Sequence, residues 1–301
     1  MNKTLTAEWD GVDLVPLLTL EKIGTDRFRI PYNESNSGGE IFGGQYLGQA
    51  MSAALATGGG RAPHAMHAFF LQAARANRQL EAEVERVRDG RSFAHRRVHL
   101  LQDGKLVFCA DVSLHDTELD QPQHQIGPSE VPSPEVLSNL HQLVEKYGEA
   151  AFGPLGRKRI LPRKVTEVRP INQQAGMLGS GTEPRADIWM RAARFAPQDD
   201  LMHFAALAYL SDYWVNSACR VMHSRSLFNG ETTSASLNHS IWFHGRAKVE
   251  DWLLYLLDSP STHGGTGFNR GLIYDRKGNL LASTAQEALV RNLAHEPMQT
   301  V

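Results

Sequence analysis

The sequence is poor in cysteine and contains no long apolar run. Its two cysteines, Cys109 and Cys219, lie in apolar surroundings, so we expect small buried side chains rather than redox or metal-binding groups. No stretch approaches the roughly 18 apolar residues that span a bilayer, and the first ten residues lack the apolar core of a signal peptide. We therefore expect no membrane insertion and a cytoplasmic location.

A charge excess of either sign is also absent. The chain has 31 Lys and Arg against 33 Asp and Glu, a formal net charge of -2. This balance provides no basic surface for nucleic acid, so we predict no nucleic-acid partner. None of the 13 histidines falls at a metal-ligand spacing, so we also predict no bound metal.

The chain does contain an internal repeat. A segment around His67 precedes extended segments at 80–87, 92–101 and 106–114, and the same order recurs from His239 with segments at 252–257, 267–274 and 280–290. Matching landmarks lie about 172 to 174 positions apart, so one supersecondary unit occurs twice. The 301 residues are enough for two domains of roughly 100 to 150 residues.

Each copy begins with an expected helix, at 43–57 and 200–218. Both helices are rich in Ala on their apolar side, which suits close packing against a sheet. The last two strands of each copy flank a short glycine turn, Asp103-Gly104 and Lys277-Gly278, which is typical of a hairpin. One helix wrapped by an antiparallel sheet is an α+β unit. Two such units side by side predict a double hot-dog fold with one continuous sheet.

Repeated prolines interrupt the pattern between the copies, where only 135–147 has helical periodicity. We therefore predict an N-terminal hot-dog unit at 1–118, a linker at 119–182 and a C-terminal hot-dog unit at 183–301.

Three polar residues of the second copy occupy positions where packing favours apolar ones. Helical spacing from Ala205 and Ala208 places Asp212 on the buried face. Strand alternation places Gln286 on the helix-covered face, and Ser236 lies just ahead of the strand that contains His239. Any one of these alone is more often solvated, but we expect the three to converge around one water.

The first copy lacks this polarity, because Val112 approximately matches Gln286. Such asymmetry indicates that one half keeps the chemistry and the other the shape. A carboxylate, an amide and a hydroxyl without a histidine base or an activated thiol suit a bound water better than a covalent nucleophile. Thioesters fit a hydrolase of this kind, because the thiolate leaving group needs little protonation.

Several segments together resemble the acyl-CoA thioesterase II (TesB-type) family. They are Ile41-Phe-Gly-Gly-Gln-Tyr-Leu-Gly-Gln-Ala50, Val87-Arg-Asp-Gly-Arg-Ser-Phe93, Asn238-His-Ser-Ile-Trp-Phe-His244, Glu250-Asp-Trp-Leu-Leu-Tyr255, Ala282-Ser-Thr-Ala-Gln-Glu287 and Val290-Arg-Asn292. The resemblance implies a double hot-dog hydrolase that splits acyl-CoA into fatty acid and CoA. It also implies that Asp212, Ser236 and Gln286 orient the attacking water, and that the chain forms a homo-oligomer, a dimer or tetramer. We expect no cofactor.

The sequence departs from the family pattern at two places. Leu71-Gln72-Ala73-Ala74 stands where the family often has Arg-Pro-Gly, which puts the geometry of this loop in doubt. Ser236 stands where Thr is common, which keeps the hydroxyl but loses a methyl group that restricts the rotamer.

Three further residues are candidates for substrate binding. His64 lies on a strand beside aromatic residues, where a histidine is more often a structural residue. Gly43 and Gly44 begin the first helix and could donate backbone hydrogen bonds to an oxyanion or phosphate, or could simply permit close helix–sheet packing. Arginines of the 86–97 segment could meet CoA phosphates, although alternating strand arginines usually form a solvated face.

Two other functions stay open at this level. A hot-dog acyl-CoA hydratase would need an Asn-Pro-Ile-His-like helix segment, and the nearest approach is Asp199-Asp200-Leu201-Met202-His203. A non-catalytic acyl-CoA-binding protein is the second alternative, and the intact set of Asp212, Ser236 and Gln286 argues against it.

Overall fold

The computed structural model describes residues 9–36, 38–118, 121–148, 151, 164–173, 183–223 and 231–292. The first half contains α1 (Leu14–Leu18), β1 (Glu21–Gly24), β2 (Arg27–Ile30), α2 (Gly43–Thr57), β3 (Ala62–Phe70), β4 (Leu80–Asp89), β5 (Phe93–Gln102) and β6 (Lys105–His115). A middle segment contains η1 (Pro134–Val136), α3 (Leu140–Tyr147) and β7 (Thr166–Pro170). The second half contains β8 (Ile188–Ala192), α6 (Met202–Asp212), α7 (Ser217–Arg220), η3 (Val221–His223), β9 (Thr232–Ser236), β10 (Asn238–Phe243), β11 (Leu253–His263), β12 (Thr266–Tyr274) and β13 (Leu280–Asn292).

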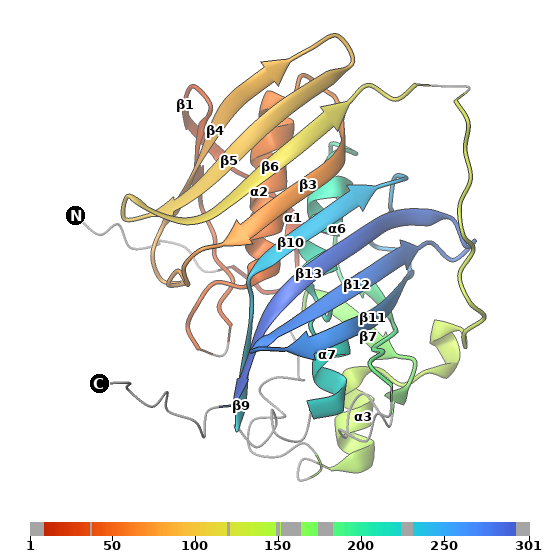
Figure 1. Cartoon of the computed structure of the whole chain (residues 1–301). Helices are drawn as coiled ribbons and strands as arrows, with labels where there is room; N and C mark the ends of the chain where they lie inside the picture. The colour runs from red at the N-terminus through yellow and green to blue at the C-terminus, as the bar shows by residue number, and fades with distance from the viewer. Residues whose placement is uncertain are drawn as a thin grey trace.

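The described strands form one continuous antiparallel sheet of 13 strands with the order β1-β2-β4-β5-β6-β3-β10-β13-β12-β11-β8-β7, and β9 pairs with β13. Equivalent strands of the two halves occur in opposite order on the two sides of the central β3–β10 pair. Figure 1 shows α2 and α6 behind this sheet, one behind each half. The arrangement confirms the predicted repeat and the double hot-dog architecture.

Equivalent hairpins close the two halves at their glycine turns. The β5–β6 turn places Asp103 at φ 53° and Gly104 at φ 75°, the pair of positive values that a tight I′-type hairpin requires. The turn between β12 and β13 contains Gly278 at φ 82°. The two turns therefore occupy the same place in the two units, as the repeat predicted.

The small residues of α2 permit close contact with α6, and this corrects our expectation of helix–sheet packing as their main use. A Cβ added to Gly44 would collide with the backbone oxygen of Tyr209 and the ring of Phe42, and one added to Gly48 would lie 3.1 Å from the backbone oxygen of Ala205. These positions require glycine because the two helix backbones approach so closely.

The second expected helix, 200–218, was predicted too long. The α6 helix ends at Asp212, and Trp214 has φ 77°, a left-handed conformation that a right-handed helix cannot include. A separate short helix, α7, follows at Ser217–Arg220. The prediction ran past the true end because Val215 and Ala218 continue the apolar pattern, and both are buried, Val215 in the turn and Ala218 in α7.

The predicted linker contributes to the second half of the sheet, because β7 pairs with β8. Its helix is shorter than expected: α3 begins after Asn139, which forms a capping box with Gln142. Residues 119–120, 149–150, 152–163 and 174–182 of the linker lie outside the described residues.

Two landmarks of the repeat, His67 and His239, are not equivalent in space. His67 is exposed and pairs with Ser240, whereas His239 is fully buried on the helix side. A shift of one residue along a strand moves a side chain to the opposite face. Met66, which is also fully buried, occupies the place in the first half that His239 occupies in the second.

The cysteines only partly match the expectation of burial. Cys219 is buried, but Cys109 is only partly so, and both are free thiols. None of the described helices combines the length and apolar character needed to cross a bilayer.

Candidate active site

The structure brings together the three polar side chains that the sequence indicated. The Gln286 side-chain nitrogen lies 2.9 Å from Asp212 Oδ1 and 3.0 Å from Ser236 Oγ. The Ser236 hydroxyl in turn donates to Asp212 Oδ1 at 3.1 Å. We expected a water to join the side chains, but here they contact each other directly.

Each side chain reaches the cluster from a different element. Asp212 is the last residue of α6, so its carboxylate projects from the end of the helix. Ser236 is the last residue of β9 and pairs with Ala288 of β13. Gln286 lies two residues before Ala288 on β13 and shares its helix-facing side, with 0% of its surface exposed.

The two carboxylate oxygens of Asp212 have different surroundings. Oδ1 accepts the hydrogen bonds from Gln286 and Ser236. Oδ2 faces the first residue of α2, where a Cβ added to Gly43 would lie only 2.5 Å away. Within the described ranges, no donor is bonded to Oδ2, so this oxygen is available to a water or ligand.

The first turn of α2 therefore borders the carboxylate. The amides of Gly43 and Gly44 precede any intrahelical acceptor, and in the described part of the chain neither donates a hydrogen bond. Such free amides at a helix N-terminus favour negative charge. A side chain at Gly43 would collide with Asp212 and one at Gly44 with α6, so the two positions require glycine for different reasons.

Sequence reasoning missed Asn216, which joins the same cluster. Its side-chain nitrogen donates to Ser236 Oγ at 3.1 Å, and its oxygen accepts from Gln286 at 2.9 Å. Asn216 lies in the turn between α6 and α7. A signal was present, since Asn216 lies four residues after Asp212 and helical spacing in the expected helix placed it on the same face.

His239 is the second residue that sequence reasoning missed. Its Nδ1 contacts the Gln286 side-chain oxygen, and its Nε2 lies 2.9 Å from Ser211 Oγ. Burial lowers the pKa of this imidazole. A signal was present, since Ile241 and Phe243 follow at steps of two and are both buried, which places His239 on the same inner face.

The chain matches two family models in sequence. Residues 32–115 match the model described as the acyl-CoA thioesterase N-terminal domain, and residues 127–290 match the acyl-CoA thioesterase C-terminal domain. The chain belongs to the acyl-CoA thioesterase family. By that membership it is an acyl-CoA thioester hydrolase, and the resemblance stated from its motifs is confirmed.

Individual relatives agree over nearly the whole chain. Acyl-coenzyme A thioesterase 8 of Mus musculus is 30% identical over 95% of this chain and 91% of its own length. Acyl-CoA thioesterase 2 of Haemophilus influenzae is 29% identical over 93% and 97%, respectively.

Solved structures agree on the fold. The acyl-CoA thioesterase II TesB2 from Mycobacterium marinum superposes with a TM-score of 0.74 at 27% identity, covering 92% of this chain and 97% of that one. A hot-dog protein of unknown function from Alicyclobacillus acidocaldarius has the same TM-score of 0.74 at 20% identity, covering 92% and 97%, and shares the fold.

His64, a candidate for binding the thioester substrate, lies apart from the Asp212 cluster. Its Nε2 bonds Ser113 Oγ at 2.7 Å, and its ring packs against Phe93 and His115. Burial is the main cause that lowers its pKa. These contacts are those of a structural strand histidine, and His64 has no place in the mechanism below.

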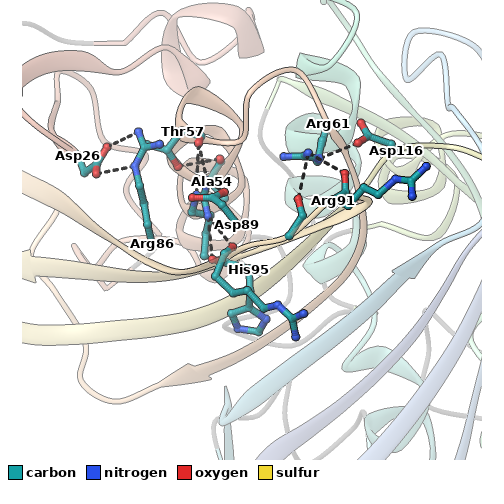
Figure 2. Close-up of polar contacts among 12 residues, drawn as sticks. Asp26, Ala54, Thr57, Arg61, Arg86, Asp89, Arg91, His95 and Asp116 are labelled. Carbon is teal, nitrogen blue, oxygen red and sulfur yellow. Dashed lines mark hydrogen bonds and ion pairs between the residues drawn. The ribbon is translucent and has the colours of Figure 1, made fainter.

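The arginines proposed for CoA phosphates are largely paired within the protein. Figure 2 shows Arg86 facing Asp26, with a closest distance of 2.8 Å, and Arg97 lies 3.0 Å from Asp111. Arg96 is 1% exposed and bonds the backbone oxygen of Thr57 at the end of α2. In the described ranges, no three His, Cys, Asp or Glu side chains gather as metal ligands would.

Proposed function

We propose that this thioesterase hydrolyses acyl-CoA by direct attack of a water held on Asp212 Oδ2. The observation that carries the proposal is that the two oxygens of this carboxylate have different surroundings. Oδ1 is held by Gln286 and Ser236, and Oδ2 is open towards the start of α2. A water on Oδ2 would lie between a general base and a row of backbone amides.

Asp212 is the general base in this scheme. It takes a proton from the water as the oxygen attacks the thioester carbonyl carbon. The Gln286 amide and the Ser236 hydroxyl fix the carboxylate so that Oδ2 keeps its direction. Restricting a reacting group in this way removes entropy from the barrier in advance.

Ser236 is better suited to holding the carboxylate than to attacking the substrate. Its oxygen accepts a hydrogen bond from Asn216, and the Gln286 amide nitrogen lies 3.0 Å from it. Its own proton is directed at Asp212. A nucleophilic serine needs free lone pairs and a strong base such as imidazole, and His239 contacts Gln286 and Ser211 instead.

The start of α2 would stabilise the negative charge that develops on the carbonyl oxygen. The free amides of Gly43 and Gly44 are the donors for this oxyanion. Collapse of the tetrahedral intermediate breaks the carbon–sulfur bond, the CoA leaves as a thiolate, and the proton held by Asp212 passes to that sulfur or to solvent. No cofactor takes part in the proposed steps. We still predict a homo-oligomer, a dimer or tetramer, and a cytoplasmic location.

A thiol-release assay with acyl-CoAs of several chain lengths tests the proposal. We expect release of one CoA thiol per acid formed in wild type and near-complete loss in Asp212→Asn. A hydratase would consume enoyl-CoA without thiol release, and a binding protein would retain acyl-CoA unchanged. Either result, or near-normal turnover by Asp212→Asn, would contradict the proposal.

A further inference from the structure

The proposed mechanism leaves one fully buried histidine without a role. His239 has 0% of its surface exposed, and both of its ring nitrogens have side-chain partners. It reaches Asp212 only through neighbours: Gln286 contacts Asp212 directly, and Ser211 precedes Asp212 on α6. The imidazole thus bridges the strand side and the helix side of the cluster.

The Gln286 amide has two possible orientations, of which one suits the site. With its nitrogen towards Asp212, it donates to the carboxylate and to Asn216 Oδ1. Turned by half a rotation, it would aim its oxygen at the Asp212 carboxylate, and two acceptors would face each other. A donor on the opposite side of the amide is what selects the first orientation.

His239 provides that donor when Nδ1 carries its proton. Its burial disfavours the charged form and so lowers its pKa, which leaves a neutral ring with one N–H group. Nδ1–H then donates to the Gln286 oxygen, and Nε2 faces the Ser211 hydroxyl 2.9 Å away, whose one proton can go to this nitrogen or to the Ala208 backbone oxygen at 2.8 Å. The Tyr255 hydroxyl bonds the Ser211 backbone oxygen at 2.9 Å and holds this part of α6 in place.

We infer that His239 is a positioning residue, whose Nδ1–H fixes the orientation of the Gln286 amide and thereby the direction of the Asp212 carboxylate. The inference rests on the proposed function for its effect on turnover. The donor and acceptor pattern on the ring is a separate property that can be measured without substrate.

Three substitutions of His239 distinguish the donor from the ring. His239→Asn keeps an N–H donor near the place of Nδ1, His239→Gln moves the amide to the place of Nε2, and His239→Leu removes both. We expect kcat to fall about 10- to 100-fold in His239→Leu and His239→Gln with little change in KM, and His239→Asn to recover most of the loss. His244→Leu is the matched control, because this exposed histidine just after β10 also bonds a serine, Ser283, at 2.8 Å.

A double mutant shows whether His239 acts through Gln286. In a Gln286→Ala background, His239→Leu should slow turnover little further, because the amide that it orients is gone. Equal losses for all three His239 variants, or full additivity with Gln286→Ala, would overturn the inference. Thermal melting of each variant checks that the fold is retained.

Nitrogen chemical shifts of the His239 ring provide a test that needs no activity. We expect an Nδ1–H signal in the folded protein at neutral pH, lost in His239→Leu and unaffected by Asp212→Asn. An Nε2–H tautomer would contradict the inference whether or not the protein hydrolyses thioesters. Conversely, an Nδ1–H ring in a protein that releases no thiol would contradict the proposed function and leave the ring assignment standing.

Discussion

The two halves of the molecule place different side chains at equivalent points of the same scaffold. In the second half, Asn269 pairs with Gln286 across β12 and β13, and His239 lies next to Gln286 on β10. In the first half, the row across β5, β6 and β3 consists of Arg96, Val112 and Met66. A row of three polar residues in one half thus corresponds to an arginine and two apolar residues in the other.

The helix ends reveal why this difference matters. The C-terminus of a helix carries partial negative charge and favours a cation. At the end of α2, the Arg96 guanidinium bonds the Thr57 backbone oxygen at 2.9 Å, in agreement with this rule. At the end of α6, the carboxylate of Asp212 opposes it. Gln286 and Ser236 offset that cost by hydrogen bonding, as does the start of α2 beside Oδ2.

One half is therefore arranged for stability and the other accepts an unfavourable charge. A carboxylate at a helix C-terminus, 7% exposed, contributes little to folding that an apolar residue could not supply. The proposed mechanism accounts for its presence, because there it acts as the general base. The comparison predicts that substitutions in the polar row of the second half lower turnover, whereas those in the row of the first half lower stability.

Asp212→Asn should have the largest effect. We expect kcat to fall by roughly two to four decades while the fold is retained, because the amide cannot accept a proton from water. Thiol release measures the rate, and circular dichroism checks the fold. Thr57→Ala, at the corresponding end of α2, is the control and should keep near-normal turnover. A comparable loss there would contradict the division between the halves.

Gln286→Val should come next, because it gives the second half the residue of the first. We expect a loss of about one to three decades in kcat, since Asp212 loses a donor. Asp212→Asn combined with Gln286→Ala should be little slower than the worse single mutant, because Gln286 acts on the water only through the Asp212 carboxylate. The control is Val112→Ala, which should lower stability without changing turnover per folded molecule. Independent, multiplying losses in the double mutant would refute a shared water.

Arg96→Met should lower the free energy of unfolding by about 2 to 4 kcal/mol, because buried backbone oxygens lose their donor. Asp89, its ionic partner, has a 48% exposed side chain and can be solvated, so no buried charge remains. Denaturant titration measures the loss. Arg97→Met, at a neighbouring arginine whose side chain is 45% exposed, should cost less than about 1 kcal/mol. A large fall in turnover in Arg96→Met would show that the first row also supports catalysis.

Much of this arrangement could be predicted from the sequence. The repeat gave two equivalent units in one continuous sheet, because hairpin turns and strand periodicity are local signals. Gln286 was found by alternation along its strand, and Asp212 by helical spacing. The helix ends at Asp212, but this residue still has the side-chain direction of the last helical turn, so the spacing placed it on the correct face.

What the sequence could not give depends on tertiary contacts. Asn216 lies four residues after Asp212, but the placement of its side chain depends on the turn at the left-handed Trp214, which the sequence did not reveal. His239 is equivalent to Met66 rather than to His67, and this depends on the register between β3 and β10. The offset between the two copies in the sequence is uncertain by one residue, so it could not decide between them. One residue decides which face of the sheet a side chain occupies.

The smallest expected effect concerns pH and again separates the halves, since Met66 cannot titrate where His239 can. Burial holds the pKa of His239 below its ordinary value of about 6.5, and nearby Asp212 only partly opposes this shift. Between the two values the unfolded chain binds more protons than the folded one. His239 therefore lowers the stability of the folded protein as the pH falls below about 6.5, by at most about 1.4 kcal/mol per pH unit.

We expect the melting temperature of wild type to drop between pH 7 and pH 5.5 by about 2 to 4 °C more than that of His239→Asn. His64 and His244, whose pKa values burial also lowers, titrate in both proteins and cancel in the comparison. Parallel melting curves for the two proteins across this range would mean that His239 does not resist protonation in the folded state.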